Sequence, residues 1–345
     1  MGLIEPYLPD IWLFIIGFFL LYYAVADGYG LGVGILSLFA RDEEERSIMM
    51  ESIESTWHDN QTWLVLLGGM LFGAFPLFYS LVLSSLYIPI LLMLFGLIFR
   101  GISFEFRSNS DEKRTWSLSF GFGSLIVTIA QGFALGGLLS GLPVKDGVFA
   151  GSVWGWLNPF SVLVTAGVLA GYVMLASNYL ILKTHDEIQQ RSYRISLLSS
   201  IITLVVSVTV HLRIVAMYPH AAGKWTHPPD CYAVWAFVLL AGIAFVLLLV
   251  SLKQRREIAP LFCNMGIILF SFVGMSVAMY PYMIPNVIAS PLTVHSVAAS
   301  PDTLWFMLVV VMVLIPLILT YTGYKHRLFR GKTTGIGYES EKGHG

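Results

Sequence analysis

Polar and ionisable side chains gather at the start of a long apolar run. The heptad, as we call it below, reads Trp57-His58-Asp59-Asn60-Gln61-Thr62-Trp63, and no formally charged residue follows from Trp63 to Phe99. At about 1.5 Å per residue, one helix through that run would far exceed the thickness of a bilayer, so we expect the chain to fold back near Pro76. The heptad then lies in a membrane span, where ionisable groups are costly and mark functional sites.

Proton transfer is the chemistry that these residue types favour. Histidine titrates closer to neutral pH than other side chains, and Glu54, His58 and Thr62 follow one another at intervals of one helical turn. With Gln61 they form a polar seam on the expected helix. One interpretation of this seam is a proton route, and the other is a solvated helix end near a charged loop.

Two further ionisable residues accompany apolar segments. Asp27 lies well inside the first of them, beside Gly28, and a buried carboxylate must be protonated, paired or in contact with water. We expect Asp27 to handle protons, or else to be half of a structural ion pair. Arg100 closes the third segment, where it could bind the carboxylate of Asp27 or Asp59, or a cofactor propionate.

Composition and patterning predict the elements that position these residues. The chain has 345 residues, of which 56% are hydrophobic and 12% charged, whereas about a quarter of a soluble domain is charged. We therefore expect an all-α membrane protein of nine transmembrane helices. The expected spans are Ile11–Phe39, Ile53–Phe75, Leu77–Phe99, Trp116–Leu139, Leu157–Leu182, Ile195–Met217, Ala233–Leu252, Leu261–Met283 and Thr303–Tyr324.

Lysine and arginine residues set the expected orientation. Almost all of them fall on alternate connections and on the C-terminal tail, and only Lys145 and Lys224 fall on the opposite connections. By the positive-inside rule the N-terminus is outside and the C-terminus is cytoplasmic. We expect residues 1–330 to form a single transmembrane domain and residues 331–345 to form a polar, disordered cytoplasmic tail.

Glycines four residues apart predict close helix contacts, with neighbouring helices or with a partner subunit. The pairs are Gly28 with Gly32, Gly30 with Gly34, Gly69 with Gly73, and Gly132 with Gly136. A nucleotide-binding loop is excluded, because Val33 stands where a G-x-G-x-x-G motif requires glycine.

The histidines and cysteines do not suggest a metal or haem site in this chain. Cys231 and Cys263 are far apart in the sequence, and only His58 and His211 lie within expected spans. Those two histidines belong to opposite leaflets and cannot ligate one haem iron. We expect proton-capable groups here, no ligated metal and no catalytic residue of a redox centre.

Six motifs, in this order, resemble subunit II of cytochrome bd-type quinol oxidases, and several are most similar to the cyanide-insensitive branch. They are Ala26-Asp27-Gly28 with Gly30, Gly32 and Gly34; Trp57, Asn60, Gln61 and Trp63; Gly73 to Pro76; Phe99 to Arg107; Leu157 to Phe160; and Tyr280-Pro281 through Pro285. The likeness runs from the first expected span to the ninth. Trp57, Asn60, Gln61, Trp63, Gly28 and Gly32 form its structural motif.

The resemblance implies an enzyme of the bacterial inner membrane that oxidises quinol and reduces O2 to water with cytoplasmic protons. It implies two four-helix bundles plus one extra helix, paired as a heterodimer with subunit I. The haems, two of b type and a third of b or d type, belong to that partner. A bound quinone, lipids and a small single-helix accessory subunit are further partners known in the family. Asp27 and Arg100 match an aspartate and an arginine near its proton route.

The sequence departs from the family pattern inside the heptad. The family usually has Trp-Asp-Gly-Asn where this chain has Trp57-His58-Asp59-Asn60, and Gly30 stands where many members have a second aspartate. One residue is about 100° around a helix, so Asp59 does not simply replace the missing acid. Our hypothesis is that Glu54 pairs with His58 and compensates for it.

Two other functions fit the sequence. In a proton-coupled transporter of small solutes, Asp27, His58 and Arg213 would line the substrate path. In a purely structural scaffold, the chain would only hold subunit I in place. Haem spectra that appear only with a partner subunit favour the oxidase, whereas solute uptake by the isolated chain favours transport.

Overall fold

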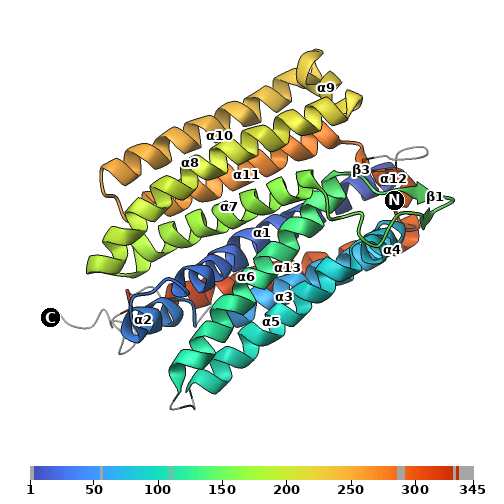
Figure 1. Cartoon of the computed structure of the whole chain (residues 1–345). Helices are drawn as coiled ribbons and strands as arrows, with labels where there is room; N and C mark the ends of the chain where they lie inside the picture. The colour runs from blue at the N-terminus through green and yellow to red at the C-terminus, as the bar shows by residue number, and fades with distance from the viewer. Residues whose placement is uncertain are drawn as a thin grey trace.

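Helices make up nearly all of the computed structural model (Figure 1), which describes residues 4–54, 57–108, 110, 112–285, 292–328 and 332–333. For residues 57–60, 108 and 325–328 only the backbone is described. Helices satisfy their own backbone hydrogen bonds, as the interior of a bilayer requires. The all-α membrane fold expected from the sequence is confirmed, while the number of spans and their orientation remain predictions.

Within the described residues, eight helices are long and apolar enough to cross a membrane. They are α1 (Leu8–Ser37), α5 (Tyr87–Ser108), α6 (Lys113–Leu139), α7 (Pro159–Lys183), α8 (Asp186–Met217), α10 (Asp230–Lys253), α11 (Ala259–Met279) and α13 (Pro301–Leu328). A short 3-10 helix, η1 (Glu5–Tyr7), precedes α1. Several of the eight long helices extend beyond the expected spans. For example, α8 begins at Asp186, because acidic residues stabilise the first turn of a helix.

The second expected span, Ile53–Phe75, corresponds to parts of two helices. α2 (Glu43–Glu54) is polar, and its last residue is Glu54. α3 (Trp57–Ala74) has 18 residues, so its length of about 27 Å is close to the hydrocarbon thickness of a bilayer. Ser55 and Thr56 lie outside the described residues. α3 therefore takes the place of the second expected span.

The expectation of a single helix from Leu77 to Phe99 is wrong. α4 (Pro76–Ser85) has only ten residues, and α5 starts anew at Tyr87. Leu86 separates the two helices with φ −116° and ψ 20°.

Pro89 explains this break, because it lies in the first turn of α5 and has no backbone N–H to donate to the preceding turn. The spanning helix consequently continues to Ser108. Arg100 therefore lies inside α5, and the expectation that it closes the span is also wrong.

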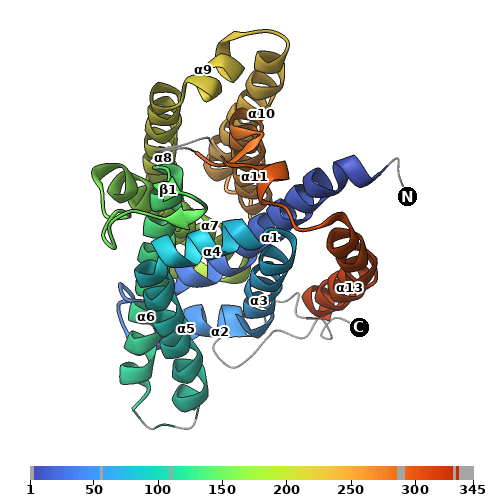
Figure 2. The same cartoon turned by 90° about the vertical axis from the view of Figure 1, so that its right-hand side faces the viewer.

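Small elements fill the connections at the end of the molecule where the N-terminus lies (Figure 2). Two antiparallel hairpins, two short helices and a cis peptide bond before Pro281 were not expected from the sequence. The elements are β1 (Val144–Lys145) paired with β2 (Val148–Phe149), α9 (Pro219–Thr226), β3 (Tyr282–Ile284) paired with β4 (Leu292–Thr293), and α12 (Val294–Val297).

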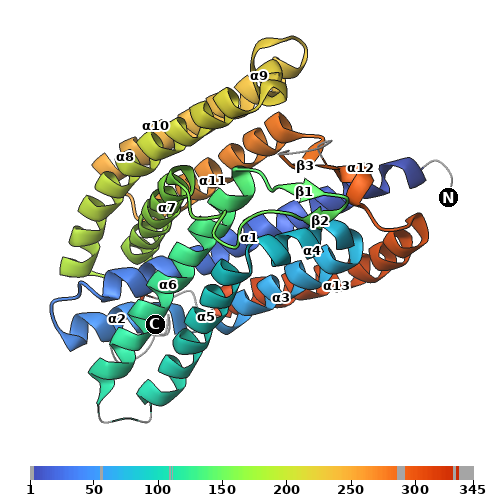
Figure 3. The ribbon, with the colours of Figure 1, turned by 45° about the vertical axis from the view of Figure 1, so that its right-hand side comes forward.

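Eight of the helices form two groups of four, as the family resemblance implies. α1, α3, α5 and α6 make the first bundle, and α7, α8, α10 and α11 make the second. α7 also packs against α1 and α6 and so joins the two bundles, while α13 lies beside α3 (Figure 3). Bulky side chains such as Trp12, Phe19 and Trp63 fill a core between α1, α3, α4 and α13.

Ion pairs tie helices together at the opposite, charged end. Glu43 of α2 contacts Arg46 at 2.5 Å and Arg107 of α5 at 3.4 Å. Of the tail expected from residue 331 onward, Lys332 and Thr333 are described. Lys332 pairs with Glu257 at 2.9 Å. The tail thus contacts the connection between α10 and α11.

Candidate functional site

An ion pair lies in the interior of the first bundle. Arg100 Nη1 donates to Asp27 Oδ1 at 2.9 Å, and both side chains are completely buried. α1 contributes the acid and α5 the base, which are 73 positions apart in the sequence. A charged hydrogen bond of this kind neutralises two groups that are individually costly in a bilayer. Of the ligands considered for Arg100, the structure brings Asp27 to it.

A hydrogen-bonded chain extends from this pair across two more helices. Tyr23, one turn before Asp27, donates to Asp27 Oδ2 at 3.1 Å. Gln131 Nε2 of α6 donates to the Tyr23 hydroxyl at 2.7 Å, and the Tyr172 hydroxyl of α7 donates to Gln131 Oε1 at 2.8 Å. The donors therefore all point toward Asp27. We call Asp27, Arg100, Tyr23, Gln131 and Tyr172 the Asp27 network.

Arg100 keeps unused hydrogen-bonding capacity. Within the described residues, its Nε and Nη2 atoms are buried without a hydrogen-bond partner. Its guanidinium lies 5.4 Å from the ring centre of Phe120, within the range of a cation–π contact. A Cβ at Gly30 would lie 3.1 Å from Nη2, so the helix position that many family members fill with an acid faces this arginine.

Glycines allow the helices around the site to approach closely. A Cβ at Gly32 would lie 2.1 Å from the Tyr172 carbonyl oxygen, and one at Gly28 would lie 2.8 Å from the Tyr172 ring. On the other face of α1, a Cβ at Gly34 would lie 2.1 Å from Ser124 Oγ of α6. Gly28, Gly32 and Gly34 thus set α1 against α6 and α7, which carry the far end of the Asp27 network.

The backbone places the heptad beside this network. Trp63 is buried, and its ring centre lies 4.1 Å from that of Tyr22 on α1. α1 and α3 run in opposite directions (Figure 1). The step from Trp63 back to His58 and the step from Tyr22 forward to Asp27 therefore run the same way along the bundle. Each is five residues long and covers about 7.5 Å. The start of α3 is level with Asp27.

The remaining expected site residues are only partly visible. The side chains of Trp57, His58, Asp59 and Asn60 lie outside the described residues. Gln61 is half-buried, and Glu54 is exposed in the isolated chain at the end of α2. The expected pairing of Glu54 with His58 is therefore untested by the geometry.

Sequence reasoning missed Tyr23 and Tyr172 as members of the site. A signal for Tyr23 was present, because it precedes Asp27 by four residues and so shares its helix face. Gln131, an amide in the middle of an apolar span, was not selected as a site residue either. Tyr172 carries no local signal, since its hydrogen-bond partner Gln131 lies on a different helix.

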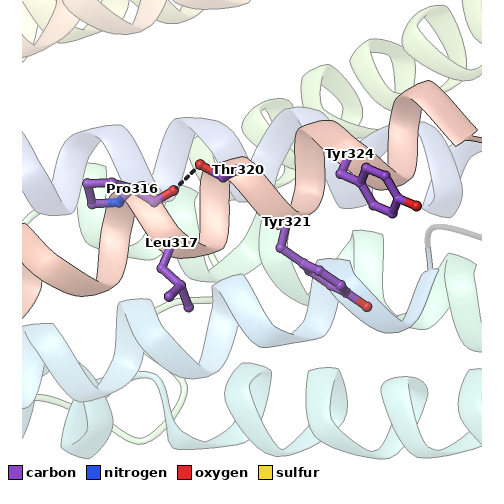
Figure 4. A pocket seen from close by; sticks show the side chains of 5 residues that line it. All are labelled: Pro316, Leu317, Thr320, Tyr321 and Tyr324. Atoms are coloured by element: carbon purple, nitrogen blue, oxygen red, sulfur yellow. Dashed lines mark hydrogen bonds between the residues drawn. The ribbon is translucent and has the colours of Figure 1, made fainter.

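Two surface hollows lie along α13. Between α3 and α13 an apolar groove with a volume of about 330 Å³ is lined by Val65, Met70 and Ile315, among others. A second hollow lies farther along α13 beside Pro316, Leu317, Thr320, Tyr321 and Tyr324 (Figure 4). There the Thr320 hydroxyl donates to the Pro316 carbonyl at 2.7 Å. Neither hollow adjoins the Asp27 network.

Comparisons with known proteins agree on one family. The family model for cytochrome bd terminal oxidase subunit II matches residues 8–329. Cytochrome bd-I ubiquinol oxidase subunit 2 of Escherichia coli K12 is 33% identical over 204 residues, which make up 56% of this chain and 54% of that protein. The chain thus spans about half the length of this curated relative.

A second relative and a solved structure extend the match. Cytochrome bd ubiquinol oxidase subunit 2 of Bacillus subtilis 168 is 27% identical over 255 residues, which are 72% of this chain and 74% of that protein. A chain in the structure of bd oxidase from Geobacillus thermodenitrificans superposes with a TM-score of 0.77 at 16% identity, covering 93% of this chain and 98% of that chain. At that identity the superposition shows the fold alone.

Proposed function

The chain belongs to the cytochrome bd terminal oxidase subunit II family, and from this premise we propose that it pairs with a haem-bearing subunit I to oxidise quinol and reduce O2 to water. It is a multi-pass protein of the bacterial inner membrane. In this complex the chain itself carries no haem ligand and is inactive alone. The match over residues 8–329 is the observation that carries the proposal.

Within the complex, we propose that the Asp27 network forms part of the route that brings cytoplasmic protons to the partner's haems. A proton route needs groups that exchange protons at short steps, and buried ionisable residues in a membrane interior are functional by default. Tyr23 and Arg100 both donate to Asp27, so they orient its carboxylate. The unused Nε and Nη2 of Arg100 suit a further anionic or water ligand inside the bundle.

The start of α3 supplies the entrance to this route in our proposal. Its backbone is level with Asp27, and α2 brings a series of glutamates to the same end of the bundle. Glu54 and His58 together take the role of the acid that the family usually places at position 58. Glu54 is the last residue of α2 and precedes His58 by four residues in the sequence.

The test of the proposed function is to produce the chain together with a subunit I of the same family. We expect the purified complex to show haem difference spectra and quinol-dependent O2 consumption, and the chain alone to show neither. Difference spectra recorded with and without cyanide identify the type of the third haem and show whether the oxidase is sensitive to cyanide. Saturable solute uptake by the chain alone, without haem in the joint preparation, would instead support a transporter.

A further inference from the structure

The second bundle contains buried amides that the proposed function does not use. Asn178 of α7 and Asn264 of α11 are both 0% exposed. Ser196 of α8, also fully buried, donates to Asn178 Oδ1 at 2.6 Å. Among the described residues, Asn178 Nδ2 and both Nδ2 and Oδ1 of Asn264 have no hydrogen-bond partner.

Packing around these amides places them on one seam. Around the axis of α7, the position of Asn178 lies between that of Leu175, which belongs to one hydrophobic cluster, and that of Met174, which belongs to another. On α11, Asn264 likewise lies between Leu261 of the first cluster and Ile267 of the second. α7 packs directly against α8 and α11, as Figure 1 shows. Both amides therefore face the boundary between the same two clusters, where α7 meets α11.

The chemistry of the unused groups selects the ligand. Asn178 offers donors, and Asn264 offers donors and an acceptor. A cation would satisfy only the Asn264 oxygen and would be repelled by the amide hydrogens, whereas water both donates and accepts. Turning either amide over exchanges oxygen for nitrogen but leaves each side chain with unused capacity. Buried polar groups left unpaired are costly, and ordered water is their usual partner.

We propose that Asn178 and Asn264 form a buried hydration site in the second bundle, where ordered water bridges α7 to α11 and Ser196 holds the Asn178 amide in place. This site is separate from the Asp27 network, because Tyr172 precedes Asn178 by about 9 Å along α7. The water fixes the register of two helices whose other contacts here are apolar side chains.

Radiolytic hydroxyl labelling of the whole complex tests for the water directly. Met174 lies one turn before Asn178, and Met174 and Met50 are each 1% exposed, so Met50 is a matched control. Water bound at the site generates radicals beside Met174, whereas Met50 lies on α2, which carries none of the three residues of the site. We expect Met174 to be oxidised several-fold faster than Met50. Equal rates for the two methionines overturn the proposal.

A double-mutant cycle then tests whether one water joins the two amides. In N178L and N264L each, the other amide is left buried without its bridge, so both variants lower the melting temperature of the complex and abolish the excess labelling of Met174. The double variant N178L/N264L removes both unpaired amides, and we expect it to lose less than the sum of the single variants. Additive losses with unchanged Met174 labelling contradict a shared site. If a single variant fails to assemble, the labelling of the unaltered complex decides the matter.

Discussion

Arg100 Nη1 lies 2.9 Å from Asp27 Oδ1 in the interior of the first bundle, and neither side chain has any exposed surface. The pair joins α1 to α5, two helices that are not adjacent in the sequence. Burial makes the two charges interdependent, since each would be far costlier alone than with its partner. This interdependence gives the pair a signature that a surface salt bridge lacks.

Removing one charge should destabilise the complex more than removing both. We expect Asp27→Asn or Arg100→Gln alone to cost about 3–5 kcal/mol, because a buried charge is left without a counter-ion. The double variant should recover much of the melting temperature and should still not restore O2 consumption, if Asp27 carries protons. Full recovery of turnover in the double variant would show that the pair is only structural.

The hydroxyl of Tyr23 provides a milder test of the same route. Tyr23→Phe keeps the buried ring and deletes two hydrogen bonds, the one that the hydroxyl donates to Asp27 and the one that it accepts from Gln131. A hydrogen bond to a charged group contributes about 1.5–3 kcal/mol. We expect turnover to fall several-fold while the haem spectra stay unchanged. Tyr172→Phe, which alters only the far end of the network, is the matched control and should have a smaller effect.

Particular residues show what the sequence could predict. Apolar length predicted nearly every helix that is long enough to span, because the thickness of a bilayer fixes that length. The break at Leu86 was missed, since the sequence does not distinguish a proline in the first turn of a new helix, such as Pro89, from any other proline in an apolar run. Asp27 and Arg100 were both selected from the sequence, and the structure pairs them. The membership of Gln131 and Tyr172 in the network depends on which helices meet, and spacing along one chain does not reveal that.

The approach of α1 to α7 predicts a strong effect at Gly32. A Cβ there would lie 2.1 Å from the Tyr172 carbonyl oxygen and 2.6 Å from Ala176 Cβ. Gly32→Ala therefore forces the two helices apart, and we expect a loss of about 1–3 kcal/mol in stability, as for other overpacked sites. Gly171→Ala on α7 is the control, because a Cβ there meets nothing within 4 Å. Equal melting temperatures for the two variants would contradict the packing.

Stability should depend on acid pH through Glu43 at the charged end. Burial tends to raise the pKa of Glu43, but hydrogen bonds from Ser117 and Arg46 outweigh it and hold the pKa below the ordinary value of 4.5. A lowered pKa in the folded state means that ionised Glu43 stabilises the fold above pH 4.5, and that this contribution disappears as the pH falls through the folded-state pKa.

The variant Glu43→Gln removes this contribution. Its melting temperature should lie below that of the unaltered complex near neutral pH, by a difference worth at most about 1 kcal/mol for a partly exposed pair. This gap between the two melting temperatures should close at acid pH. Glu44→Gln, at the exposed neighbouring position, is the control and should show no such closing gap. A gap that persists unchanged below the ordinary pKa of glutamate would contradict the assignment.

The heptad is where this chain departs most from its family, and Glu54 with His58 is the pair to test. If these two residues replace the missing acid as the proton entrance, Glu54→Gln and His58→Gln should each slow O2 reduction several-fold without loss of haem, since neither change alters the partner. The effect should grow as the pH rises, because protons then become scarce at the entrance. Glu44→Gln on the exposed face of α2 controls for the general loss of negative charge near the membrane. Unchanged turnover in both variants would remove Glu54 and His58 from the route and leave Asp27 to be supplied from the partner subunit.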